Sequence, residues 1–114
     1  MAKLECKLHG DFFRVLEEID KSVMSGSLSA SIEDGSNYSC GGVLCAVRVY
    51  ERYSIIGKNR VSLSVTLLGC GSELFLSAIA SGGSQAVLLK INTIGEEAFL
   101  NTISDAVAKF RAAQ

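Results

Sequence analysis

The sequence predicts an α+β domain in which a single antiparallel sheet has two helices packed on one face. Apolar and polar residues alternate through five segments separated by short turns, and strands joined by such turns are antiparallel neighbours. Two further segments carry apolar residues at helical spacing. The predicted order is one strand, one helix, four or five strands and a final helix, all within one domain spanning residues 1–114.

The first strand and the first helix are predicted from alternation followed by a cap. Residues 3–9 alternate as a half-buried strand does, with Leu4, Cys6 and Leu8 on one face. Asp11 is predicted to cap a helix that ends at Gly26. The apolar positions of this helix recur every three or four residues: Phe12, Leu16, Ile19 and Val23.

The middle of the chain predicts a run of strands. They are expected at residues 27–33, 43–53, 61–67 and 73–81. Glycine-containing turns are expected at 34–37, 57–59 and 69–72. Residues 87–91 fit either a short last strand or the approach to a helix. In the second of these strands one face is entirely apolar, and we expect it to point to the core: Val43, Cys45, Val47 and Val49.

The final helix is predicted to begin with a capping box formed by Thr93 and Glu96. The predicted core combines the apolar faces of all elements: Leu28, Ile32, Val47, Val49, Leu63, Val65, Phe99, Ile103, Val107 and Phe110. The opposite sheet face is expected to hold apolar residues among serines: Leu44, Ala46, Tyr50, Phe75 and Ile79. Removing water from a face of this kind costs little free energy, so the face is suited to contact with a second copy.

The composition and charge of the chain favour some classes of function and argue against others. Apolar residues make up 48% of the chain and charged residues only 20%, which favours a homo-oligomer because a small core cannot hide all the apolar area. A net charge of −1 argues against a nucleic-acid surface. The chain lacks an apolar run of about 18–20 residues and its start alternates with charges, so we expect no membrane association and a cytoplasmic location. In that compartment we expect the four cysteines to remain reduced.

The predicted element order resembles the TATA-binding-protein-like fold, which includes the helix-grip domains. That resemblance implies an apolar ligand held between the C-terminal helix and the sheet. We expect no cofactor. The segments Cys40-Gly41-Gly42, Ser81-Gly82-Gly83-Ser84-Gln85 and Asn92–Glu97 also resemble a small bacterial family of unknown function. That second resemblance implies no activity.

Candidate site residues are few. Cys40 precedes two glycines whose amides are suited to support an anion beside a thiol. Gly82, Gly83 and Ser84 follow a strand, as a phosphate-binding loop does, but they lack the Walker pattern. For each of these motifs a simple turn is the more frequent explanation.

A basic and aromatic cluster is the third candidate. Arg48, Tyr50 and Arg52 share one strand face and are suited to an anionic ligand, although charged strand residues more often only guard a sheet edge. His9 lacks the cysteine or histidine spacing of a zinc site, so we expect neither a metal site nor catalytic residues.

Three functional hypotheses follow. The first is a non-enzymatic binding module for a small apolar or amphipathic ligand between the C-terminal helix and the sheet. The second is a structural or interaction protein that acts as a homo-oligomer. The third is a cysteine-dependent enzyme that uses Cys40.

Overall fold

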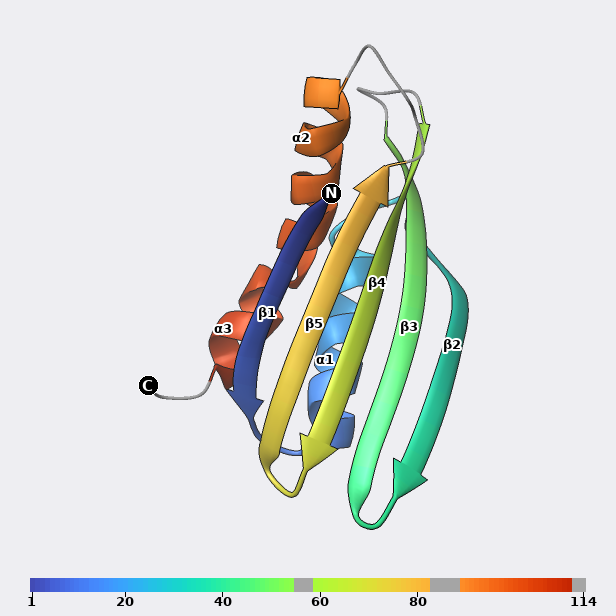
Figure 1. Ribbon diagram of the computed structural model, residues 1–114. Helices are drawn as coiled ribbons and strands as arrows, with labels where there is room; N and C mark the ends of the chain where they lie inside the picture. Colours follow the sequence, from blue (N-terminus) through green and yellow to red (C-terminus); the bar gives the residue numbers. More distant parts are fainter. Residues whose placement is uncertain (55–58, 83–88, 112–114) are drawn as a thin grey trace.

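The computed structural model describes residues 1–54, 59–82 and 89–111. The elements are β1 (Ala2–His9), α1 (Phe12–Ser25), β2 (Ser31–Cys40), β3 (Val43–Ser54), β4 (Asn59–Cys70), β5 (Glu73–Gly82), α2 (Leu89–Leu100), the 3-10 helix η1 (Asn101–Ile103) and α3 (Ser104–Phe110). The strands form one antiparallel sheet in the order β1-β5-β4-β3-β2. In Figure 1 all the helices lie on one side of this sheet, so the predicted α+β class is confirmed.

The start of α1 agrees with the sequence prediction. Asp11 is the N-cap, and one of its carboxylate oxygens accepts a hydrogen bond of 3.0 Å from the backbone N–H of Arg14. The helix ends at Ser25, just before Gly26. Its buried side chains are Phe12, Val15, Ile19 and Val23. They fix α1 against the sheet.

We call the helix-covered side of the sheet the inner face and the opposite side the outer face. The core lies between the inner face and the helices. Two strands supply most of the sheet residues in it: Val61, Leu63, Val65 and Leu67 from β4, with Leu74, Leu76, Ala78 and Ala80 from β5. The C-terminal segment supplies Phe99, Ile103, Val107 and Phe110, as predicted. Burying each large apolar side chain contributes roughly 1.5–3 kcal/mol, so these two strands anchor the fold.

The second strand differs from the prediction. β2 begins at Ser31 and runs through residues 34–37, which we expected to form a turn. The actual turn is Gly41-Gly42, where φ is +57° and +84°. A two-residue hairpin turn of type I′ has positive φ at both central positions, which glycine adopts without strain. Leu28, which precedes β2, and Ile32, which lies in it, are both exposed, so their predicted burial is wrong.

The third strand has the predicted alternation but the opposite orientation. Ala46 and Tyr50, which we expected on the outer face, are buried on the inner face, and Leu44 is half-buried beside them. Val47 and Val49 lie on the outer face and are only half-buried. Alternation shows which residues share a face, but the helices decide which face is covered.

The C-terminal segment begins earlier than predicted. α2 already includes Leu89, so Thr93 lies inside the helix and cannot be its N-cap. Residues 89–91 are therefore helical, and 87–88 lie outside the described residues. Glu96 is instead buried, and its carboxylate accepts a hydrogen bond of 2.7 Å from the backbone N–H of Gly82. Among the described helices, none is long and apolar enough to cross a membrane.

Candidate functional site

The structure turns the predicted basic and aromatic cluster toward the helices. Tyr50 is fully buried, and its hydroxyl donates a hydrogen bond of 3.0 Å to Oδ1 of Asp20 on α1. Burial, and then the neighbouring Asp20 carboxylate, raise the pKa of Tyr50 because both disfavour the phenolate. Tyr50 therefore ties β3 to α1 and does not present a surface to a ligand.

The two arginines of this cluster also have structural partners. The Arg48 guanidinium donates hydrogen bonds to the carbonyl oxygens of Val47 and Ser36, at 2.9 and 3.2 Å. The Arg52 guanidinium carbon lies 4.8 Å from the centre of the Phe99 ring, a cation–π distance. Burial lowers the pKa of Arg52. Both guanidinium groups are therefore held by contacts within the protein on the helix-covered side of the sheet.

The glycine segment after β5 does not form an open anion site at the position described. The N–H of Gly82 is already donated to the buried Glu96 carboxylate, whose Oε1 lies 2.6 Å from the Met1 amino nitrogen. A phosphate here would compete with that carboxylate and be repelled by it. Gly83 and Ser84 lie outside the described residues.

The cysteines divide between the two faces. Cys6 is buried on the inner face, and burial raises the pKa of its thiol. The other three lie close together on the outer face, since Cys40 pairs with Val43, Val43 pairs with Cys70, and Cys45 is two residues beyond Val43. All four thiols are free. Within the described ranges, no group of three or more His, Cys, Asp or Glu side chains is arranged to hold a metal ion.

The outer face is the most distinctive surface of the described residues. Residues paired directly across antiparallel strands point to the same side, so the pairing register orders this face into rows. One row is Lys7, Phe75, Leu68, Cys45 and Tyr38. The next is Glu5, Ser77, Thr66, Val47 and Ser36. The third is Lys3, Ile79, Ser64, Val49 and Asp34.

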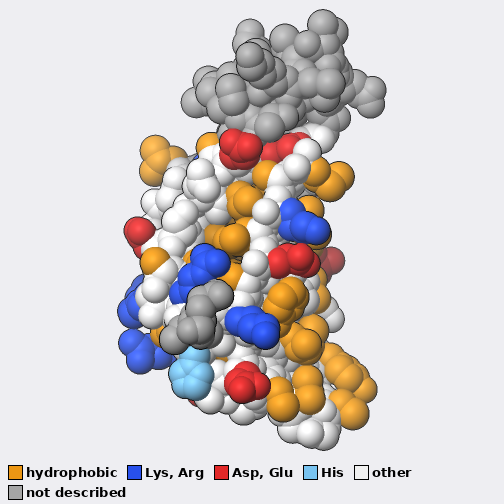
Figure 2. All heavy atoms as spheres, turned by 60° about the vertical axis from the view of Figure 1, so that its left-hand side comes forward, with side chains coloured by type: hydrophobic (Ala, Val, Ile, Leu, Met, Phe, Trp, Pro, Cys, Tyr) orange, Lys and Arg blue, Asp and Glu red, His pale blue; other side chains and the backbone are white. Residues whose placement is uncertain are grey.

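The middle of these rows is apolar or carries short hydroxyls. Leu68, Phe75 and Ile79 are 42%, 39% and 37% exposed, and Tyr38 is 69% exposed. Figure 2 shows the molecule turned to bring the β1 side forward, with hydrophobic side chains gathered beside a group of Lys and Arg residues. A sheet face turned to water usually carries polar residues along its strands, so this apolar strip resembles a surface that is covered.

Charge lies at the two margins of the outer face and differs in sign. The β1 margin carries Lys3 and Lys7, with Glu5 between them. The β2 margin carries Glu33, whose carboxylate lies 3.9 Å from the guanidinium of Arg60 on β4, and Arg60 also forms an ion pair of 2.8 Å with Glu51 on β3. The pairing with Glu51 raises the pKa of Arg60. Asp34 adds a further negative charge to this margin.

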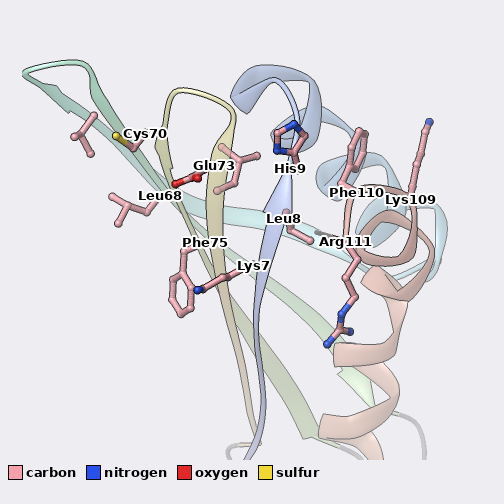
Figure 3. Close-up of a pocket in the computed structure, with 12 residues that line it drawn as sticks. Lys7, Leu8, His9, Leu68, Cys70, Glu73, Phe75, Lys109, Phe110 and Arg111 are labelled. Atoms are coloured by element: carbon pink, nitrogen blue, oxygen red, sulfur yellow. The ribbon is translucent and has the colours of Figure 1, made fainter. Parts of the chain in front are cut away.

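An open pocket of about 950 Å³ lies where the outer face meets the end of α3. In Figure 3, Lys7 and Phe75 lie together on one side of β1, while Phe110 and Arg111 lie on the other side. Arg111 is held there by an antiparallel bridge to Leu8. The lining of the pocket therefore combines apolar side chains with the cations Lys7, Lys109 and Arg111 and one carboxylate, Glu73.

The sequence predicted this face as a contact surface, and Phe75 and Ile79 lie on it as expected, but the wrong side of β3 was expected there. A signal was present: β3 carries apolar side chains on both faces, as a strand does when both faces are buried. Of the predicted site residues, only Cys40 lies on the outer face among those described.

Comparison with known proteins identifies the family of this chain. No curated protein and no solved structure matches this chain. One family model, described as a family of unknown function (DUF6054), matches residues 1–111. The chain therefore belongs to the DUF6054 family.

Proposed function

We propose that this protein is an interaction protein that acts as a homodimer, in which the outer faces of two sheets cover each other. The observation that carries this proposal is the outer side of β3, where Val43, Cys45, Val47 and Val49 are consecutive outward residues without a helix over them. A strand with this many successive apolar residues on its outward side is typical of strands that are buried on both sides. Tyr50, which the sequence predicted on this face, has no part in the interface because it is buried on the inner face.

The proposal is tested by placing a charge on each sheet face. Val47→Glu puts a carboxylate in the middle of the outer face, and Phe75→Glu does the same on β5. Asn37→Glu is the matched control, because Asn37 is exposed and pairs with the inner-face residue Ala46. Sedimentation velocity should show dimers for the natural chain and the control, and monomers for both outer-face variants.

Thermal melts of the same proteins separate dissociation from unfolding. The monomeric variants should retain a cooperative transition, because the core does not include either substituted side chain. A monomeric natural chain, or outer-face variants that stay dimeric, would contradict the proposal.

A second candidate function is the binding of a small apolar or amphipathic ligand between the C-terminal helices and the sheet. A specific feature favours it: a pocket of about 320 Å³ along the free edge of β1, between Leu4 and the helix residues Leu100 and Val107. That volume lies at the small end of ligand sites. Native mass spectrometry of the purified protein should then show a species heavier than the chain, and Ala108→Trp, which fills the pocket, should abolish it.

A further inference from the structure

We infer that the two copies are related by a twofold axis that runs along β4, parallel to the strands. This inference rests on the proposed homodimer and specifies how its two subunits meet. The basis is the placement of unlike charges at the two margins of the outer face, on either side of an apolar centre.

The geometry of stacked sheets restricts the arrangement. Two sheets that pack face to face in the aligned class keep their strand directions within about 30° of each other. A twofold axis between such sheets therefore runs nearly parallel or nearly perpendicular to the strands. Because β4 is the middle strand of five, a parallel axis along β4 places β1 opposite the partner's β2, and β5 opposite the partner's β3. Each row of the outer face then lies opposite the same row of the other copy.

The charges favour the parallel axis. Lys3 and Asp34 are the two ends of one row, so the parallel axis brings Lys3 of each copy opposite the partner's Asp34. One oxygen of Asp34 accepts the N–H of Gly35 at 2.8 Å, which leaves the other for this contact. In the single chain, Nζ of Lys3 lies 3.7 Å from Oε1 of Glu5. This ion pair is exposed, so breaking it to form the new contact costs little free energy. A perpendicular axis through the central row would place Lys3 opposite the partner's Lys7, and the two copies of Glu5 opposite each other.

The row that contains Lys7 supplies the aromatic contact. The parallel axis brings the partner's Tyr38 opposite Lys7 and the partner's Cys45 opposite Phe75, at the pocket of about 950 Å³. Tyr38 is 69% exposed in the single chain, and its ring would there lie close to the Lys7 ammonium group, a cation–π contact. In the same row Leu68 meets the partner's Leu68 on the axis, which gives the interface an apolar centre.

The size of the face is adequate for a stable dimer. Five strands about 4.8 Å apart, with five outward rows about 7 Å apart, give a surface of roughly 24 by 30 Å. This is about 700 Å² on each copy, close to the roughly 800 Å² that each partner contributes to a standard interface.

A charge exchange tests the arrangement. Lys3→Asp and Asp34→Lys should each raise the dimer dissociation constant about tenfold, since each places like charges opposite each other at two symmetric positions. The double variant, with the pair reversed, should restore the dissociation constant of the natural chain. If the double variant instead has a dissociation constant raised by both single effects together, the parallel axis is wrong.

Cross-linking tests the position of the axis independently. Cys70 lies on β4 and so next to the axis, whereas the two copies of Cys40 would be about 19 Å apart across four strand spacings. A variant with Cys40→Ser and Cys45→Ser retains Cys70 as its exposed thiol, and one with Cys45→Ser and Cys70→Ser retains Cys40. A short bismaleimide should link the first variant into covalent dimers and leave the second unlinked.

The outcomes distinguish this inference from the proposed function. If the first variant sediments as a dimer but does not link through Cys70, the axis is wrong and the homodimer stands. If linking is equal at Cys40 and Cys70, the axis is also wrong. If the natural chain is monomeric, the proposed homodimer and this inference both fail.

Discussion

The hydroxyl of Tyr50 on β3 donates a hydrogen bond of 3.0 Å to Oδ1 of Asp20 on α1. Tyr50 is fully buried, so this bond satisfies a polar group that would otherwise lie unpaired in the core. The bond fits the orientation of β3, in which Ala46 and Tyr50 both point to the inner face. Val47 and Val49 are consequently turned outward, where they form the centre of the proposed interface.

Removing the Tyr50 hydroxyl should destabilise the domain modestly. Tyr50→Phe keeps the ring in the core but loses the hydrogen bond, so the free energy of unfolding should fall by about 1 kcal/mol. Urea denaturation of the natural and variant chains measures this difference. The matched control is Tyr53→Phe, at an exposed position of the same strand, which should change stability little. Equal effects at both positions would mean that the Asp20 contact contributes nothing.

Tyr50 also predicts how stability depends on alkaline pH. Its pKa is raised in the folded chain by burial and by Asp20, while in the unfolded chain it is close to about 10. Above that pH the unfolded chain loses the proton first, so the free energy of unfolding should decrease as pH rises beyond about 10. Chemical denaturation between pH 8 and about 11 should show this decline, and Tyr50→Phe should reduce it. If the free energy of unfolding of the variant declines with the same slope, the decline arises from other titrating groups.

Core truncations should be costly where the structure buries the side chain. Leu63 and Ile103 are fully buried, so Leu63→Ala and Ile103→Ala should each cost about 2–5 kcal/mol. Leu28, which the sequence placed in the core, is fully exposed, so Leu28→Ala should cost less than about 0.5 kcal/mol. Thermal or urea unfolding of the three variants tests this order, and a cost at Leu28 equal to the others would contradict the described packing.

The cysteines should differ in their reaction with thiol reagents. Cys6 is buried and its pKa is raised, so it should react only after unfolding. Cys40 is exposed at the hairpin end, at a corner of the outer face, and should react faster than Cys6 in the native protein. Timed alkylation followed by peptide mass spectrometry ranks them, with the denatured protein as control. If Cys6 in the native protein is labelled as fast as Cys40, the inner face of β1 is accessible to solvent, which contradicts the described packing.

Much of the fold could be predicted from the chain because local signals and packing agree. The Asp11 cap, the Gly26 stop and the alternation of Val61, Leu63, Val65 and Leu67 all lead to the observed elements. The prediction was wrong where two nearby segments both had the sequence of a turn. Asp34-Gly35 has turn chemistry, but the Gly41-Gly42 pair accepts positive φ at both positions and forms the turn.

The site was harder to predict, since its location depends on which face the helices cover. Both faces of β3 carry apolar residues, and alternation alone cannot rank them. The inward direction of Arg48 and Arg52 follows from contacts with distant segments, namely Ser36 and Phe99. The charged margins of the outer face depend on the pairing of β1 with β5, a contact between distant parts of the chain.

Sedimentation equilibrium of the unaltered chain at micromolar concentration tests the central claim most directly, because it reports the mass of the species in solution without any substitution. The chain has a mass of 12.1 kDa, so face-to-face pairing predicts a species of twice that mass. The mass should fall toward 12.1 kDa on dilution, as a reversible dimer requires. A constant mass of 12.1 kDa from micromolar to near-millimolar concentration would show that the outer face remains uncovered by a second copy, and would contradict the account.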